Sequence, residues 1–181
     1  MKRAYSATAT FFGMATTVLL VGHAIAQTPG NLLTPEQKEM LTQLPIPIVA
    51  PTYLPKGFRL ISASGEQGQY ANGDDDSGYS LSYLGANNTC IRLTSSKDGS
   101  RGQAANVVET PFGSIEVFTQ TLQGKPFIYS FIPVPGNPSL SSGGTIQEGV
   151  GSRATWKTCN AVPMEQYIQI LQSLEVVKRA N

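Results

Sequence analysis

The stretch PFIYSFIPV at residues 126–134 decides the fold. In an extended chain successive side chains alternate between faces, so Phe127, Tyr129 and Phe131 share one face and two isoleucines lie on the other. A strand that is apolar on both faces is covered on both sides. We therefore predict a central strand here, together with a second element that covers it.

The last periodic segment of the chain is the best candidate for that cover. In AVPMEQYIQILQSL, residues 161–174, apolar side chains recur at helical spacing, and Pro163 stands in the first turn, where proline is favoured. The side chains expected to face the sheet are Met164, Tyr167, Ile168, Leu171 and Leu174. The segment predicts an amphipathic helix packed across the sheet.

Other segments alternate as strands do. Tyr79, Leu81 and Tyr83 share one face, residues 85–88 read GANN and predict a hairpin loop, and residues 89–93 return. Further strands are expected at residues 107–108, 115–119 and 154–159. The predicted fold class is α+β, a sheet with an amphipathic C-terminal helix packed on one face.

A short helix and a stiff connector are expected before the sheet. Thr34, Pro35 and Gln37 form the pattern of an N-cap, a first-turn proline and a reciprocal capping partner, which predicts a helix through about Gln43. The prolines of PIPIVAPT, residues 45–52, then impose an extended path. We expect its apolar side chains along the domain surface or at a sheet edge.

The next stretch, PTYLPKGF at residues 51–58, leads the chain into the sheet. Leu54-Pro55-Lys56-Gly57 fits a type I turn with proline second and glycine fourth, and Phe58 is expected to start the next strand. Tyr53 and Phe58 would flank the turn as two apolar plugs.

The N-terminus has the layout of a secretory signal peptide at residues 1–26. Two basic residues precede an apolar stretch at about 11–22, which is too short to span a bilayer, and Ala24-Ile25-Ala26 offers a small-residue cleavage site. An uncleaved anchor is the alternative, and polar residues within the stretch argue against it. We expect a periplasmic or secreted product with no transmembrane segment, a helix and connector at 27–52 and a single α+β domain at 53–177.

The expected mature chain is nearly neutral and has no histidine. The 181-residue sequence has 13 Lys and Arg and 12 Asp and Glu, and removing Lys2 and Arg3 leaves 11 against 12. Without a basic stripe, nucleic acid is not an expected partner. His23, the single histidine, lies in the predicted signal peptide, which excludes histidine-dependent triads and histidine-ligated zinc. We predict no cofactor and no metal.

The chain has two cysteines, Cys90 and Cys159. In an exported protein a disulfide is the natural expectation, whereas a redox-active pair normally has the spacing C-x-x-C. We predict a structural bond between the strand that carries Cys90 and the strand before the last helix.

Three motifs resemble those of a known family: P-x-Y-L-P-x-G-F at 51–58, FGSIEVF at 112–118, and Trp156 before a helix that closes with Leu171-Gln172-Ser173-Leu174. The family is the uncharacterised domain of bacterial envelope proteins found beside anti-sigma factors and sporulation lipoproteins. It is similar to the C-terminal part of the periplasmic sigma-E regulator and, more distantly, to lipoprotein-carrier folds. The resemblance implies a curved antiparallel sheet with a packed C-terminal helix, and binding or sensing rather than catalysis.

Strand alternation indicates one candidate site. Cys90 and Arg92 share a face of one strand, and Arg153, Lys157 and Cys159 share a face of another, so the disulfide would gather three cations into a patch for an anionic ligand or partner. The alternative is that these are ordinary solubilising charges. The aromatic side chains are interpreted as core.

Two segments rich in glycine and serine, 66–78 and 135–144, are predicted to be loops. The run Asp74-Asp75-Asp76 in the first does not fit an EF-hand, because Ser77 stands where the glycine should be and Tyr83 where the glutamate should be. A non-standard calcium site and a solvated loop both stay open.

Two functional hypotheses follow. The first is a non-catalytic binding or sensing module of the bacterial envelope, with no catalytic residues, whose partner is an envelope protein, peptide or lipid. The second is a small extracytoplasmic hydrolase that acts through carboxylates. An enzyme of that kind requires two carboxylates that converge in a cleft, whereas a binding module requires an apolar groove or patch.

Overall fold

A seven-stranded antiparallel sheet forms the body of the protein. The computed structural model describes residues 33–69, 73, 76–95, 104–122, 124–137, 140–148 and 155–178, without the side chains of 146–148 and 155–157. The strands of the sheet are β2 (Arg59–Glu66), β3 (Gly78–Leu84), β4 (Cys90–Ser95), β5 (Ala104–Thr110), β6 (Gly113–Leu122), β7 (Lys125–Phe131) and β8 (Leu140–Gly143). The predicted signal peptide lies outside the described residues.

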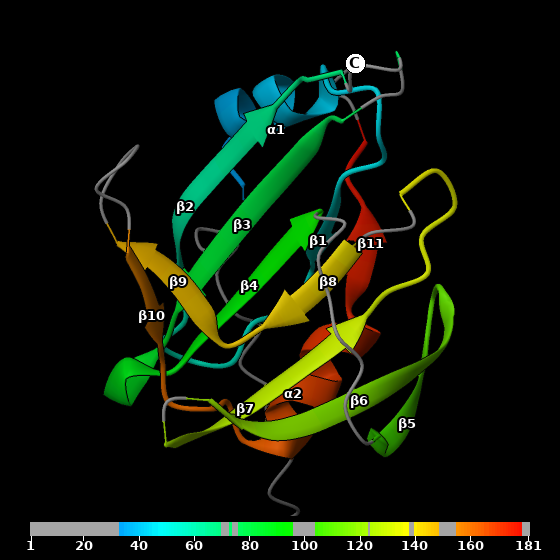
Figure 1. The fold of residues 1–181 in the computed structure, drawn as a ribbon. Coiled ribbons are helices and arrows are strands. Elements are labelled where there is room, and N and C mark those ends of the chain that lie inside the picture. The colour runs from blue at the N-terminus through cyan, green and yellow to red at the C-terminus, as the bar shows by residue number, and fades with distance from the viewer. Residues whose placement is uncertain are drawn as a thin grey trace, which may run out of the picture.

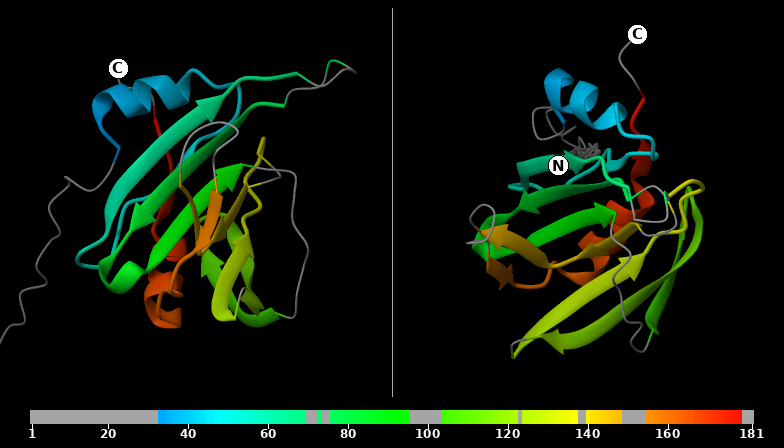
Figure 2. Two further views of the ribbon diagram at one scale, coloured as in Figure 1. Left: turned by 60° about the vertical axis from the view of Figure 1, so that its left-hand side comes forward. Right: turned by 45° about the horizontal axis from the view of Figure 1, so that its top comes forward.

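The spatial order of the strands is β2-β3-β4-β8-β7-β6-β5, and every neighbouring pair is antiparallel. The sheet is curved and does not close on itself (Figures 1 and 2). β2 and β5 are therefore its two edges.

Two helices and two small antiparallel ribbons complete the described part of the fold. The helices are α1 (Pro35–Thr42) and α2 (Met164–Gln172), and a 3₁₀ turn lies at Ala86–Asn88. One ribbon pairs β1 (Val49–Pro51) with β11 (Leu174–Val176), and the other pairs β9 (Thr145–Glu148) with β10 (Thr155–Thr158). Within the described residues, neither helix is long and apolar enough to cross a bilayer.

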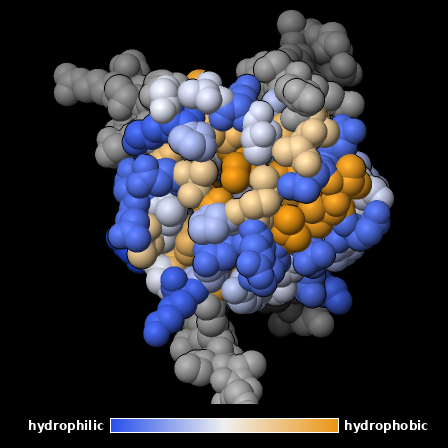
Figure 3. Space-filling view, turned by 90° about the horizontal axis from the view of Figure 1, so that it is seen from below, coloured by the Kyte–Doolittle hydropathy of each residue, from blue (hydrophilic) through white to orange (hydrophobic). Residues whose placement is uncertain are grey.

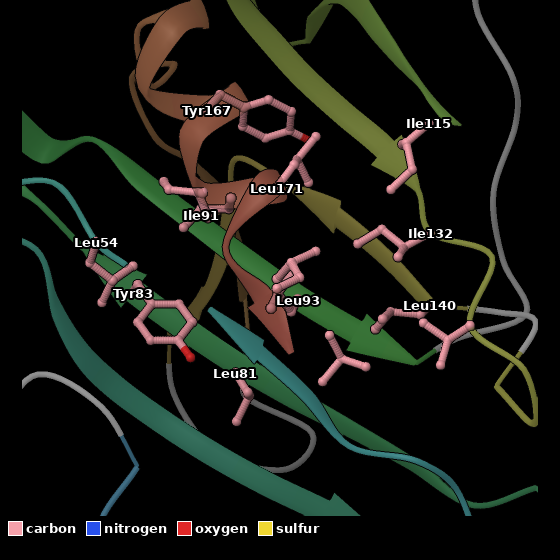
Figure 4. Packing of buried hydrophobic residues seen from close by; sticks show 14 of the residues in the cluster. Leu54, Leu81, Tyr83, Ile91, Leu93, Ile115, Ile132, Leu140, Tyr167 and Leu171 are labelled. Carbon is pink, nitrogen blue, oxygen red and sulfur yellow. The ribbon is translucent and has the colours of Figure 1, made fainter. Parts of the chain in front are cut away.

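The C-terminal helix packs on one face of the sheet, as predicted, and we call this face the inner face. α2 buries Tyr167, Ile170 and Leu171 against the sheet, whereas Met164 and Ile168 are only partly buried. Figure 4 shows Tyr167 and Leu171 reaching toward Ile91 and other strand side chains. Leu174 is buried too, but it begins β11 rather than ending the helix.

β7 lies inside the sheet, between β8 and β6, as its sequence predicted. Ser130 and Ile132 are buried on the inner face, and Tyr129 is buried on the outer face. The predicted face shared by Tyr79, Leu81 and Tyr83 is also confirmed, because all three are buried in the inner core.

The composition of the segment at 135–144 predicted a loop. This prediction is wrong for part of the segment. Leu140–Gly143 forms β8, which fills the space between β4 and β7. Small residues suit this place. Ser142 hydrogen-bonds the hydroxyl of Tyr167 from α2, and a Cβ at Gly143 would lie 3.0 Å from the Phe127 ring. Tertiary packing therefore overrides the low strand propensity of Leu-Ser-Ser-Gly.

The predicted N-terminal helix is confirmed with its capping box: Gln37 N donates to Thr34 Oγ1 at 3.2 Å, and Thr34 N donates to Gln37 Oε1 at 2.9 Å. The connector after it is extended as expected and forms β1, but Ile48 and Val49 are buried in the core rather than lying along the surface. Both the backbone N–H and the carbonyl of Val49 hydrogen-bond the hydroxyl of Tyr79, at 2.9 and 3.2 Å.

The turn at the entry to the sheet is shifted by one residue from its predicted position. Phe58 N donates to Pro55 O at 3.1 Å, so Lys56 and Gly57 are the central residues, and Gly57 has φ of +89°. A positive φ at the third position is the mark of a type II rather than a type I turn, and it favours glycine. Phe58 is buried, but Tyr53 is 38% exposed and is not a plug, and the strand begins at Arg59.

The disulfide between Cys90 and Cys159 is confirmed, and both residues are only 1% exposed. It does not join two strands of one sheet, because β10 pairs with β9 in a separate ribbon. Backbone hydrogen bonds surround it: Cys159 N donates to Gly144 O at 3.1 Å, and Asn160 N donates to Asn88 O at 2.9 Å. The disulfide therefore fastens the β9–β10 ribbon to the hairpin between β3 and β4.

Candidate functional site

Four aromatic rings lie on the outer face of the sheet, opposite α2. The alternation that puts Ile128, Ser130 and Ile132 on the inner face puts Phe127, Tyr129 and Phe131 on the outer one, and Phe118 of β6 pairs with Tyr129 across the strands. We call these four residues, Phe118, Phe127, Tyr129 and Phe131, the aromatic cluster.

The rings of the aromatic cluster contact one another in two geometries. Tyr129 stacks on Phe118 and Phe127 with centroid separations of 5.2 and 5.5 Å. Phe131 meets Phe118 and Tyr129 edge to face at 6.0 and 5.9 Å. Both geometries are favourable, each adding about 0.5–1.5 kcal/mol beyond area burial. Phe127 and Phe131 are nevertheless only partly buried, so the cluster presents apolar surface.

One end of the cluster borders a hollow of about 180 Å³ that contains Arg92. Its described lining combines three rings, Phe127, Tyr129 and Phe131, with polar groups from β4, β8 and β6, namely Arg92, Thr94, Ser141, Ser142 and Gln120. Partial burial lowers the pKa of the Arg92 guanidinium below its usual value. A guanidinium is still a cation at that site near neutral pH, since arginine is effectively always protonated. We call this site the Arg92 hollow.

The other end of the cluster borders a second, larger hollow of about 520 Å³, which we call the edge hollow. Its described lining is Val107 of β5, Ser114, Ile115, Glu116 and Phe118 of β6, and Phe131, Ile132 and Pro133. Viewed from below, the molecule shows hydrophobic side chains gathered on the side where β5 and β6 lie (Figure 3). Val107 is 65% exposed there.

A third hollow, of about 300 Å³, lies between α1 and the β1–β11 ribbon. Its described lining includes Leu33, Ala50, Pro51, Val176 and Val177, with Lys38 and Lys178 beside them. No aromatic side chain is among these described residues, which distinguishes it from the two hollows on the outer face.

The predicted cationic patch is described only in part. Cys90 and Arg92 do share the outer face of β4, since their neighbours Ile91 and Leu93 point into the core. Arg153 lies outside the described residues, and of Lys157 only the backbone is described, paired with Ile146. The convergence of three cations therefore stays a prediction, and Arg92 is the member whose surroundings are known.

Of the acidic run in the predicted loop, Asp74 and Asp75 fall outside the described residues. Asp76 is described, and its backbone N–H donates to Gly68 O at 3.0 Å. Among the described residues no group of three or more His, Cys, Asp or Glu side chains is placed to hold a metal ion. Calcium binding by this loop stays untested.

The hydrolase hypothesis requires a pair of carboxylates in a cleft. Of the described residues that line the two outer-face hollows, Glu116 alone carries a carboxylate. Glu109 is exposed on neighbouring β5 and accepts a hydrogen bond from the Ser114 hydroxyl. That hypothesis stays a prediction.

A buried polar group on the inner face is structural rather than a site. The hydroxyl of Tyr167 donates to Ser130 Oγ at 3.2 Å and shares a hydrogen bond with Ser142 Oγ. Burial raises the pKa of Tyr167 to about 12, and the two serine hydrogen bonds oppose that rise. Since this residue is 1% exposed, the group anchors α2 to β7 and β8.

The interpretation of the rings of the aromatic cluster as core is confirmed for Phe118 and Tyr129, which are buried, but not for Phe127 and Phe131, which are only partly buried. Strand alternation tells which residues share a face but not which face is covered. The sequence did contain a usable signal. Three aromatic residues lie on one face of the β7 segment, whereas a serine and two isoleucines lie on the other. No protein-family model matches the chain, and neither a curated protein nor a solved structure matches it.

Proposed function

We propose that the protein is a non-catalytic binding or sensing module of the bacterial envelope, and that the Arg92 hollow with the aromatic cluster is its binding surface. The observation that carries this proposal is the set of aromatic rings on the outer face of the sheet beside a partly buried arginine. Such a surface suits ligands with an apolar or flat body.

Arg92 adds a preference for a negatively charged group. A guanidinium donates several hydrogen bonds in a planar fork and is attracted to anions such as carboxylates, sulfonates and phosphates. The hydroxyls of Thr94 and Ser141 in the same hollow are further hydrogen-bonding groups. The expected ligand therefore combines an apolar body with an anionic group.

Two observations support an envelope setting. The buried disulfide fits a protein that folds in an oxidising compartment. The resemblance of the entry motif, the FGSIEVF strand and the C-terminal ending to a bacterial envelope domain points to the same setting, as a periplasmic or secreted protein.

The proposal can be tested with 8-anilinonaphthalene-1-sulfonate, an anionic aromatic dye whose fluorescence rises on binding to apolar surface. We expect saturable binding to the folded protein, and a dissociation constant weakened at least about fivefold by Arg92→Gln, since a charge-assisted hydrogen bond contributes about 1.5–3 kcal/mol. The matched control is Arg59→Gln, because Arg59 is exposed at the start of β2.

Urea unfolding of each variant must show that the fold is intact before the dye constants are compared. Equal dye affinity in wild type, R92Q and R59Q would refute the assignment of the surface. A loss in both variants would point to non-specific charge rather than to the Arg92 hollow.

A further inference from the structure

We propose that the ligand of the Arg92 hollow is a sugar acid, that is, a pyranose ring that carries a carboxylate. This inference rests on the proposed function, because it concerns the same surface. It goes further, because it names the chemical class of the ligand and separates it from lipids and aromatic anions.

The first step is the layout of the hollow, which follows from strand register. Gly143 of β8 lies between Arg92 of β4 and Tyr129 of β7, because it is the cross-strand partner of both. Neighbouring strands are about 4.8 Å apart, so the backbones at Arg92 and Tyr129 are about 10 Å apart. The Phe127 ring closes one side of this gap, since a Cβ at Gly143 would lie 3.0 Å from it. The cation and the rings therefore face each other across a residue that has no side chain.

The second step is the size of the hollow. Its volume of about 180 Å³ is that of about six molecules of liquid water, at about 30 Å³ each. One six-membered ring with its substituents fits a space of this size, whereas a long acyl chain exceeds it.

The third step is the hydrogen-bonding capacity of a second row of residues. Ser141 is the cross-strand partner of both Thr94 and Phe131. Thr94 Oγ1 donates to Tyr79 O at 3.3 Å, and Ser141 Oγ donates to Thr94 O at 3.5 Å. Both bonds are long, but each directs the hydroxyl hydrogen at a backbone carbonyl and leaves the lone pairs of the hydroxyl oxygen as acceptors. A ligand that matches this row brings O–H or N–H donors.

The fourth step is charge. Among the described residues that line the Arg92 hollow, Arg92 is the one with a charged side chain. A guanidinium can donate to both oxygens of a carboxylate in one plane. Gln120 lies opposite Phe127 on the same face, and its amide can both donate and accept. A sugar acid supplies a carboxylate for the guanidinium and hydroxyls for the neutral polar groups.

The fifth step is the apolar side of the hollow. Phe127 and Phe131 are only partly buried, so they are accessible to a ligand. The face of an aromatic ring is electron-rich and attracts weakly positive C–H groups, such as those on one side of a pyranose. A fatty acid or an aryl sulfonate can also contact the rings, but it leaves the acceptors of Thr94 and Ser141 without donors, which costs free energy. The hollow therefore favours a sugar acid over either of them.

The test compares three small ligands. The methyl glycoside of glucuronic acid has both hydroxyls and a carboxylate, methyl glucoside has no carboxylate, and cyclohexanecarboxylate has no hydroxyls. NMR titration of isotopically labelled protein is expected to show at least about tenfold tighter binding of the glucuronic acid glycoside than of either comparison ligand, which corresponds to about 1.4 kcal/mol. The largest amide shifts are expected at Arg92, Ser141 and Gly143.

Removal of one acceptor makes the test specific. Thr94→Val keeps the side-chain shape and is expected to weaken the glucuronic acid glycoside at least about fivefold, or about 1 kcal/mol, while binding of 8-anilinonaphthalene-1-sulfonate stays unchanged. Ser141→Ala is expected to have the same effect, and it serves in place of Thr94→Val if urea unfolding shows that variant to be misfolded. The matched control is Thr121→Val, because Thr121 is exposed on β6 and does not line the hollow; it is expected to change neither ligand.

Several results would overturn the inference. They are equal binding of the glucuronic acid glycoside and either comparison ligand, equal effects of the hollow variants and Thr121→Val, or no saturable shift up to about 100 mM glycoside, a limit of about 1.4 kcal/mol. If one of these occurs while the dye still binds in a manner that depends on Arg92, the sugar acid is refuted and the proposed function stands. Loss of that dependence refutes the proposed function itself.

Discussion

Removal of the disulfide should cost about 4 kcal/mol of unfolding free energy. Cys90 and Cys159 are 69 residues apart, and for a closed loop of that length the chain-entropy model gives about 4 kcal/mol at 25 °C. Since small proteins are stable by about 5–15 kcal/mol in total, the double variant Cys90→Ala/Cys159→Ala should be folded but much closer to its threshold.

Urea unfolding without reductant measures this directly. The double variant should show a lower midpoint and a steeper dependence on urea than the wild type, because an uncrosslinked unfolded chain exposes more surface. Hydrogen exchange should also speed up first in the β9–β10 ribbon, which the bond fastens to the β3–β4 hairpin. A loss below about 1 kcal/mol would refute the reasoning from loop closure.

Three further perturbations test the packing. Burial raises the pKa of Tyr167 from 10.0 to about 12, so the unfolded state releases this proton first as pH rises. The free energy of unfolding should therefore be full below pH 10 and should fall toward pH 12, with a shallower fall in Tyr167→Phe. A urea midpoint that is flat over this pH range would contradict this prediction. Gly143→Ala should lower the free energy of unfolding by about 1 kcal/mol, because its Cβ would lie 3.0 Å from the Phe127 ring. The control Gly144→Ala should be nearly neutral, because its Cβ would lie 3.8 Å from the nearest atoms. Equal melting temperatures of the two variants would count against this packing. Gly57→Ala should cost about 1–2 kcal/mol, because φ there is +89°, and an unchanged urea midpoint would show that the turn relaxes.

The elements with strong local signals were predictable from the sequence. Thr34, Pro35 and Gln37 specify the start of α1 through a capping box that needs no tertiary contact. Alternation alone predicts which side chains of β3 and β7 share a face, as the buried residues Tyr79, Leu81 and Tyr83 of β3 show. The cysteine pairing follows from there being two cysteines in the chain.

Other elements depend on contacts that are distant in the chain. β8 has the composition of a loop, and it becomes a strand because Ser142 meets Tyr167 and Gly143 leaves room for Phe127. β1 and β11 are strands because they pair with each other across more than a hundred residues, as the partners Val49 and Val176 show. Local propensity carries no information on such partners.

Of the candidate site, only Arg92 was predictable from the sequence. Strand alternation put Arg92 on a face with Cys90, but it could not show that the aromatic side chains of β6 and β7 continue that face. Their apolar character was interpreted as a sign of burial, which is right for Phe118 and Tyr129 but not for Phe127 and Phe131, because sequence alone does not reveal which side of a sheet a helix covers.

The most direct test of the account is to locate dye binding by NMR. In a titration of isotopically labelled protein with 8-anilinonaphthalene-1-sulfonate, the account predicts that backbone amide shifts change most at Arg92, Tyr129 and Gly143, around the Arg92 hollow. Changes concentrated instead at Ala50 and Val176, in the hollow between α1 and the β1–β11 ribbon, would contradict the claim that the outer face of the sheet is the binding surface.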